Sequence, residues 1–233
     1  MKIFKIVLTA LFVVVSLWAD PGLDAFKAKE YEKALKLWTV EADKGEPKAQ
    51  SSLSYLYFNG LGTAVDNTKG IYWLTQAAQQ NDMNAQYDLG MIFLIGKKVE
   101  QDEKTAAYWL EKASEADHAD AQYNVALIYY RGDGVDQNVT KAVQFLKASA
   151  DSGHAGSQKT ISRVYMQLLK FDKAIPWLIK DSARGDIEAD YLLGEIYCGY
   201  ERYAQAKEWT AKAIKGGYPQ AQELWDKYEL SKY

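Results

Sequence analysis

A pair of adjacent residues, most often Ala-Gln, recurs along this chain at a nearly constant spacing, and we call this pair the mark. The recurrence constrains the fold more than any other feature of the sequence. Successive marks are 36, 36, 36, 32 and 32 residues apart. A period in this range is typical of stacked helix pairs, in which each pair buries its apolar face against its neighbours. The marks are Ala49-Gln50, Ala85-Gln86, Ala121-Gln122, Ser157-Gln158, Ala189-Asp190 and Ala221-Gln222.

Two kinds of helix alternate within the period. The first kind carries the mark and places apolar residues four and seven positions after it, as in Val125 and Ile128. The second kind places a small residue three positions before a bulky aromatic one, as in Ala106 and Trp109. Such spacings put the residues on one helix face, and a small residue lets two helices approach closely. We therefore expect Trp109→Ala to cost about 3–5 kcal/mol, as a large-to-small core substitution.

The sequence thus predicts an all-α fold, a right-handed α-solenoid of about six helix-turn-helix repeats. A truncated helix over residues 20–29 is expected to precede them. After Leu168 and after Cys198 the loop is four residues shorter, which accounts for the change of period from 36 to 32. The repeat domain spans residues 20–233, with pairs at approximately 30–66, 67–102, 103–138, 139–170, 171–200 and 201–233.

The N-terminus has the features of a secretory signal peptide. Lys2 and Lys5 precede an apolar run over residues 6–15, which is shorter than the roughly 20 residues that span a bilayer. Ala19 supplies a small residue before Asp20, so we expect residues 1–19 to be cleaved. An uncleaved membrane anchor is the alternative. The mature protein is expected to be periplasmic or secreted, without stable membrane insertion.

Charge and residue content argue against several classes of function. The net charge is −3 and no basic run occurs, so nucleic acid is not an expected partner. No serine has a lysine three residues later, so the serine β-lactamase signature is absent. His118 and His154 lie one period apart and are too few for a zinc hydrolase site. We predict no catalytic residues, no metal and no cofactor.

Cys198 is the single cysteine of the chain, so an internal disulfide is excluded. Its repeat position corresponds to that of Phe58, Leu94 and Tyr130. It is expected to pack near a helix end. A reactive thiol that pairs with another chain is the alternative.

The repeats resemble a known family. The pattern A-x-A-Q-Y-x-x-A-x-x-Y-Y-x-G-x-G-V, followed by K-A-x-x-W/F-L-x-x-A, is similar to the Sel-one-like repeats, which are close kin of tetratricopeptide repeats. The resemblance extends from Glu30 to Leu230 and implies an adaptor whose concave face binds proteins or peptides. Some secreted, cysteine-rich members have been linked to penicillin binding or β-lactam hydrolysis, but the paired cysteines of that subgroup are missing here.

If the first-type helices line the concave face, a defined set of their residues forms a peptide-binding groove, which we call the strip. It is aromatic and apolar in its first half and basic, then mixed, in its second half. Aromatic residues, Met and Arg are enriched in the cores of interfaces. The alternative is that several of these rings pack inside the solenoid. The strip comprises Tyr55, Phe58, Tyr87, Met91, Leu94, Tyr123, Leu127, Tyr130, Arg131, Lys159, Arg163, Tyr191 and Glu195.

One loop carries a candidate modification site. Asn138-Val139-Thr140 matches the Asn-x-Thr acceptor of N-glycosylation, and Asp136 makes it similar to the extended bacterial acceptor. The alternative is that Asn138 only caps the next helix.

The sequence therefore favours an exported, non-enzymatic scaffold that binds proteins or peptides through its concave face. Binding or hydrolysis of β-lactams or peptidoglycan fragments is one alternative, and a self-associating structural module is another. The oligomeric state is left open.

Overall fold

The computed structural model describes residues 20–233, and the predicted signal peptide, residues 1–19, lies outside the described part. The described chain contains only helices and loops, and it divides into a first unit, residues 20–113, and a second unit, residues 114–233. The helices are α2 (Pro21–Lys27), α3 (Tyr31–Asp43), α4 (Pro47–Asn59), α5 (Asn67–Gln79), α6 (Met83–Ile95), α7 (Glu103–Glu115), α8 (Ala119–Arg131), α9 (Val139–Asp151), α10 (Ala155–Gln167), α11 (Phe171–Ala183), α12 (Ile187–Gly199), α13 (Tyr203–Gly216), α14 (Ala221–Lys227) and the short 3-10 helix η1 (Leu230–Lys232).

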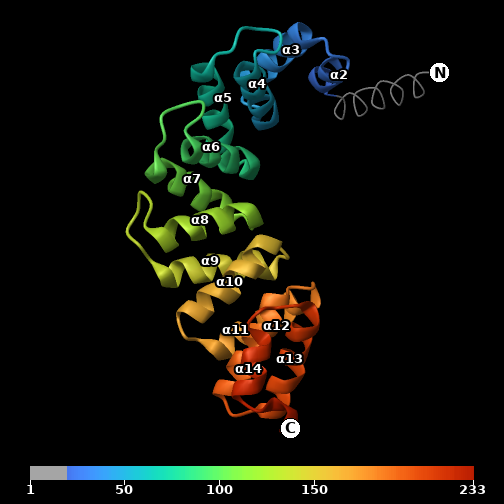
Figure 1. Cartoon of the computed structure of the whole chain (residues 1–233). Coiled ribbons are helices and arrows are strands. Elements are labelled where there is room, and N and C mark those ends of the chain that lie inside the picture. The colour runs from blue at the N-terminus through green and yellow to red at the C-terminus, as the bar shows by residue number, and fades with distance from the viewer. Residues whose placement is uncertain (1–19) are drawn as a thin grey trace, which may run out of the picture. The chain divides into compact units, whose positions relative to one another are not determined.

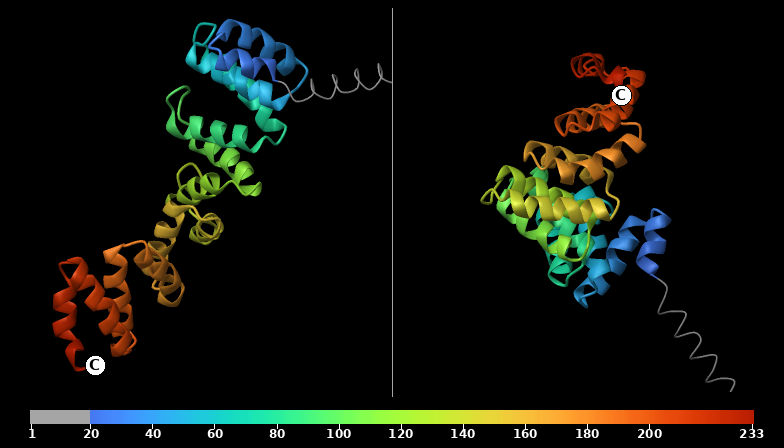
Figure 2. Two further views of the ribbon diagram at one scale, coloured as in Figure 1. Left: turned by 90° about the vertical axis from the view of Figure 1, so that its right-hand side faces the viewer. Right: turned by 90° about the horizontal axis from the view of Figure 1, so that it is seen from below.

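Within each unit, helices that follow one another in the chain pack side by side (Figures 1 and 2). In the first unit α4 packs between α3 and α5, and in the second unit α12 packs between α11 and α13. This arrangement confirms the predicted all-α solenoid of consecutive helix pairs. Among residues 20–233, no helix is both long enough and apolar enough to cross a bilayer.

In the first four repeats, the glutamine of the mark ties the first-type helix to the helix before it. Its side-chain amide donates to a backbone carbonyl eight residues earlier, in the last turn of the preceding second-type helix. Gln86 Nε2 lies 3.1 Å from the Ala78 oxygen, and the Gln50, Gln122 and Gln158 amides make the same bond. Asp190 replaces this glutamine, and the Ser182 hydroxyl, again eight residues earlier, donates to its carboxylate. The recurrence of the mark therefore has a structural cause.

The core of each unit follows the predicted pattern, with one correction. The positions four and seven after the mark are buried in the first five repeats except at Ile92, which is half-buried. In the second-type helices from α5 to α13, however, the residue after the aromatic one is more buried than the aromatic residue itself. Leu110 is 0% exposed, whereas Trp109 is half-buried. Trp109 therefore does not fill the core position expected of it.

Helix ends are fixed by local hydrogen bonds. Asp82 caps α6 by accepting a hydrogen bond from the Ala85 N–H at 2.8 Å. A glycine follows four of the second-type helices and adopts the left-handed conformation, such as Gly153 with φ of 89°. Asn81 and Asp117 hold the same position with φ of 63° and 60°, which their short polar side chains tolerate.

Candidate functional site

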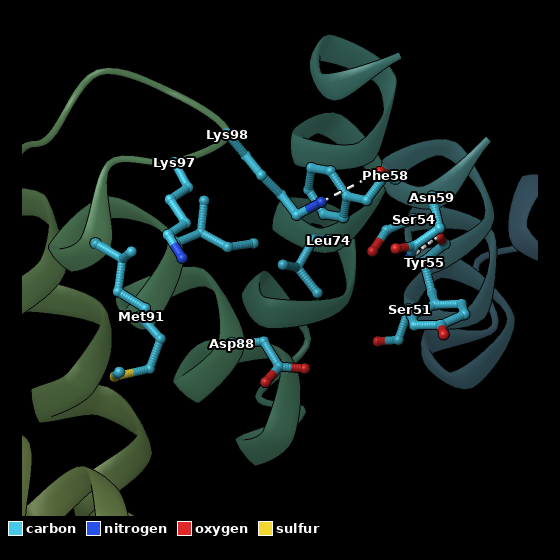
Figure 3. Close-up of a pocket in the computed structure, with 12 residues that line it drawn as sticks. Ser51, Ser54, Tyr55, Phe58, Asn59, Leu74, Asp88, Met91, Lys97 and Lys98 are labelled. Atoms are coloured by element: carbon cyan, nitrogen blue, oxygen red, sulfur yellow. Dashed lines mark hydrogen bonds between the residues drawn. The ribbon is translucent and has the colours of Figure 1, made fainter. Parts of the chain in front are cut away.

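The first unit contains an open pocket of about 390 Å³ (Figure 3). Helices α4, α5 and α6 and the loop after α6 line it, so it lies between the first and second helix pairs. Its size is at the lower end of ligand pockets, which suits one large side chain and its flanking groups. The lining residues are Ser51, Ser54, Tyr55, Phe58, Asn59, Leu74, Asp88, Met91, Ile92, Ile95, Lys97 and Lys98.

Three strip residues meet in this pocket. Tyr55 and Phe58 come from α4, and Met91 comes from α6. Tyr55 is 52% exposed, but Phe58 is only 8% exposed and belongs to the core as well as to the pocket wall. The other strip residues of this unit, Tyr87 and Leu94, are half-buried and do not line the pocket.

Two lysines bring positive charge to the pocket. Lys98 Nζ donates to the Phe58 carbonyl at 3.1 Å and lies 4.7 Å from the centroid of the Phe58 ring. These contacts hold the ammonium group beside the apolar wall. Lys97 is exposed, and both side chains come from the loop after α6 (Figure 3). The pocket is therefore an apolar hollow with a cationic side, and Asp88 is the one carboxylate among its lining residues.

In the second unit, the strip tyrosines pack against neighbouring parts of the chain. The Tyr123 ring lies 4.7 Å from the His154 ring, and the Tyr191 ring stacks on Tyr218 at 4.6 Å. The Tyr130 hydroxyl donates to the Gln167 side chain. All three strip tyrosines are half-buried, so in this unit the rings contribute to packing inside the solenoid.

The basic stretch of the strip is neutralised by ion pairs. Lys159 Nζ lies 3.0 Å from Asp186 Oδ2, and Arg163 Nη2 lies 2.8 Å from Glu188 Oε2. Both acidic partners belong to the start of the next first-type helix, so these pairs join consecutive repeats. Three other strip residues remain in this unit. Arg131 Nη1 lies 3.7 Å from Asp133 Oδ2. The Leu127 side chain is half-buried, and the Glu195 side chain is exposed.

The two histidines act as helix caps. His118 Nδ1 accepts a hydrogen bond from the Ala121 N–H at 3.2 Å, and His154 Nδ1 accepts one from the Ser157 N–H at 3.0 Å. They occupy the position that Asp82 holds in α6. This position explains why they lie one period apart.

The surroundings of Cys198 and Asn138 give each residue a structural role, the first in the core and the second at a helix end. Cys198 is 2% exposed, and its burial raises the pKa of the thiol. Asn138 is exposed and caps α9, because its Oδ1 accepts a hydrogen bond from the Lys141 N–H at 2.9 Å. The cap uses the amide oxygen, whereas a glycan would be attached to the amide nitrogen.

Several pocket residues were missed by the sequence reasoning. Ser51 lies two positions after the mark, at a strip position, but its small side chain gave no reason to select it. Lys97 and Lys98 lie in a loop, for which the repeat pattern predicts no role beyond connecting two helices. The usable signal was a departure from the repeat, since both Ser51 and Lys98 differ from the residues found one period away.

Comparison with known proteins shows which repeat family this part of the chain matches and which solved structures it is similar to. The Sel1 repeat family matches residues 47–82, 84–118 and 119–154. A protective antigen of uropathogenic Escherichia coli with an SLR fold is 27% identical, with a TM-score of 0.66, over 85% of this chain and 44% of that chain. This chain thus spans less than half of the length of that antigen. A Sel1 repeat protein from Oxalobacter formigenes is also 27% identical, with a TM-score of 0.61, over 86% of this chain and 83% of that chain. Among curated proteins, none gave a significant match.

Proposed function

We propose that this protein is an exported, non-enzymatic scaffold that binds a protein or peptide segment through its strip. Three Sel1 repeats match within residues 47–154, and such repeats generally mediate protein–protein interaction. The observation that carries this proposal is the convergence of Tyr55, Phe58 and Met91 in one open pocket. Most buried apolar positions serve repeat packing, but this hollow is not filled by the chain itself. The exposed Tyr55 and the half-buried Met91 that line it are residue types that interface cores favour.

In-cell photocrosslinking tests this function. A photoreactive residue is placed at three exposed strip positions, Tyr55, Arg131 and Glu195, and the captured proteins are identified by mass spectrometry. The control position is Gln144, which is exposed on the second-type helix α9. We expect one polypeptide to be captured from strip positions and not from Gln144. Equal capture from Gln144, or capture of nothing but further copies of this chain, would contradict the proposal.

Export is the second component of the proposal. It is supported by the basic start and apolar run of residues 1–19, and α2 begins at Pro21 with Asp20 as its cap. We propose cleavage after Ala19 and a periplasmic or secreted location. The intact mass of protein purified from the exported fraction tests both statements, since it should equal that of residues 20–233. A measured mass equal to that of residues 1–233 would refute cleavage.

Asn138 adds a proposed modification site. The side chain is exposed, and Thr140 two residues later is exposed too. We propose that a host with N-glycosylation machinery modifies this asparagine. An increase in intact mass that disappears in the Asn138→Asp variant, which keeps a capping side chain, would support the proposal. An unchanged mass in such a host would exclude it.

A further inference from the structure

The pocket of the first unit coincides with a departure from the repeat. Two positions after the mark, the second, third and fifth repeats have Tyr87, Tyr123 and Tyr191, and the fourth has Lys159. The first repeat has Ser51 there, and this serine lines the pocket. The repeat therefore places a long side chain at this position, and the first repeat omits it.

The long side chains at this position fill the space between consecutive repeats. Tyr123 packs on His154 and Lys159 pairs with Asp186, so each reaches the residue that caps the next first-type helix. The hollow that remains beside Lys159, lined by α10, α11 and the start of α12, is only about 10 Å³. The pocket beside Ser51 is about 390 Å³, and it extends from Ser51 along α4 and α6 to Lys97 and Lys98. The missing side chain thus coincides with an open pocket.

A second departure lies at the same pocket. Lys98 stands where the first and third repeats have glycine, Gly62 and Gly134. Both glycines have positive φ, of 70° and 68°, whereas Lys98 does not, so the loop after α6 has a different conformation. Its lysine side chain reaches the Phe58 carbonyl on α4 and brings a fixed positive charge to the pocket. Places where a sequence departs from its own structural pattern are where functional residues are expected.

We propose that this pocket binds the aromatic side chain of a partner peptide that carries carboxylates next to that side chain. The aromatic ring would occupy the hollow between α4 and α6. The walls suit it, because Tyr55 and Phe58 offer ring contacts and Met91 offers a sulfur contact. The neighbouring carboxylates would bind Lys97 and Lys98. This inference rests on the proposed function and names the chemistry of the partner.

The repeat itself supplies the test variants. Ser51→Tyr introduces the residue of Tyr87, Tyr123 and Tyr191, and should fill the pocket without disturbing the fold. Lys98→Gly introduces the residue of the neighbouring loops and removes the charge. Lys104→Ala, on exposed α7 surface outside the pocket, is the matched control for lost charge. Thermal unfolding of each full-length variant verifies that it folds.

Binding is measured by NMR of methionine methyl groups in the full chain. Met91 reports on the pocket, and Met166 in α10 of the second unit is the internal control. The probe is the peptide acetyl-Glu-Tyr-Glu-amide. The comparison peptides are acetyl-Glu-Ala-Glu-amide and acetyl-Lys-Tyr-Lys-amide. We expect a saturable shift of the Met91 signal with the first peptide only, at dissociation constants of about 1 mM or below, as suits a short ligand.

Each variant has its own expected effect on peptide binding. Ser51→Tyr should weaken binding about tenfold or more, since the anchor side chain is excluded. Lys98→Gly should weaken binding and reduce its dependence on salt, while Lys104→Ala should bind like the wild type. The proposal is overturned if Met91 does not respond, if the alanine peptide binds equally well, if Met166 shifts in parallel, or if a folded Ser51→Tyr protein binds normally.

The same variant separates this inference from the proposed function. Crosslinking from Arg131 and Glu195 is repeated in cells that carry Ser51→Tyr. Continued capture of the partner, together with failed peptide binding, would mean that the strip works without this pocket. Loss of capture together with loss of peptide binding is the result expected if the pocket anchors the partner.

Discussion

Single residues of this chain separate into those that serve the repeat and those that depart from it. Gln86, with its bond to the Ala78 carbonyl, serves the repeat. Ser51 and Lys98 depart from it, and both lie at the pocket. Thr210 is a third departure, because the corresponding residue is leucine in four of the other second-type helices, Leu74, Leu110, Leu146 and Leu178.

Thr210 provides a test of the cost of a buried polar group. Its hydroxyl oxygen is fully buried beside Gly194 and has no hydrogen-bond partner. Thr210→Val replaces the hydroxyl with a methyl group of similar shape, so we expect the free energy of unfolding to rise by about 1 kcal/mol. Denaturant unfolding measures it. Thr68→Val, at an exposed position of α5, is the control and should change stability by less than about 0.5 kcal/mol. A destabilised Thr210→Val protein would contradict the assignment.

The burial of neighbouring residues in α7 gives a second prediction. Leu110 is fully buried and Trp109 is half-buried. Leu110→Ala should therefore cost about 3 kcal/mol, and Trp109→Ala should cost less, although tryptophan is the larger residue. Denaturant unfolding of the two variants measures which substitution lowers the midpoint more. A larger loss of unfolding free energy for Trp109→Ala would contradict this prediction and support the core role that the sequence predicts for the tryptophan.

At the scale of an element, several helices begin at a residue whose side chain caps the helix. Asp66 caps α5, and its carboxylate accepts a hydrogen bond from the Lys69 N–H at 2.9 Å. Asp102 precedes α7 and accepts bonds from the hydroxyl and the N–H of Thr105, at 2.6 and 3.0 Å. These bonds form only when the helix forms, so they couple helix ends to the ionisation of the two carboxyl groups.

This coupling predicts a pH dependence of stability. The Lys69 backbone N–H lowers the pKa of Asp66, and the Thr105 hydroxyl lowers the pKa of Asp102. Because the folded-state pKa values are below the unfolded values, the unfolded state binds more protons. The stabilisation is therefore complete above a pH of about 4 and is lost as the pH falls through the folded pKa values. Denaturant unfolding as a function of pH should show a shallower acid decline in the Asp66→Asn, Asp102→Asn double variant. An unchanged decline would refute the coupling.

At the scale of the whole molecule, stability comes from the contacts between consecutive repeats. In the second unit, one continuous core extends from α8 to η1 and contains Trp177, Tyr197 and Cys198. A chain built in this way is expected to open in segments, which a buried reporter group can detect.

Cys198 is such a reporter. Its burial excludes reagents and raises the pKa of the thiol, so little thiolate forms near neutral pH. We expect labelling by a thiol reagent to be slow in the native protein, to accelerate in parallel with the unfolding of the second unit, and to leave no disulfide-linked dimer on a non-reducing gel. Rapid labelling of the native protein would show an exposed thiol, and a dimer would support pairing with another chain. A peptide with an exposed cysteine gives the reference rate.

Local patterns in the sequence determined the architecture. The period of the marks, the apolar spacing and the short loops each involve residues close together in the chain, so helix pairs and their buried faces could be predicted from residues such as Val125 and Ile128. The tertiary structure decided which strip residues are available. Tyr123 and Tyr191 pack on other rings and Arg163 pairs with Glu188, because their partners lie in the next repeat and in a geometry that spacing does not specify. The pocket likewise coincides with the small side chain of Ser51, and its empty space appears only when the helices around it are in place.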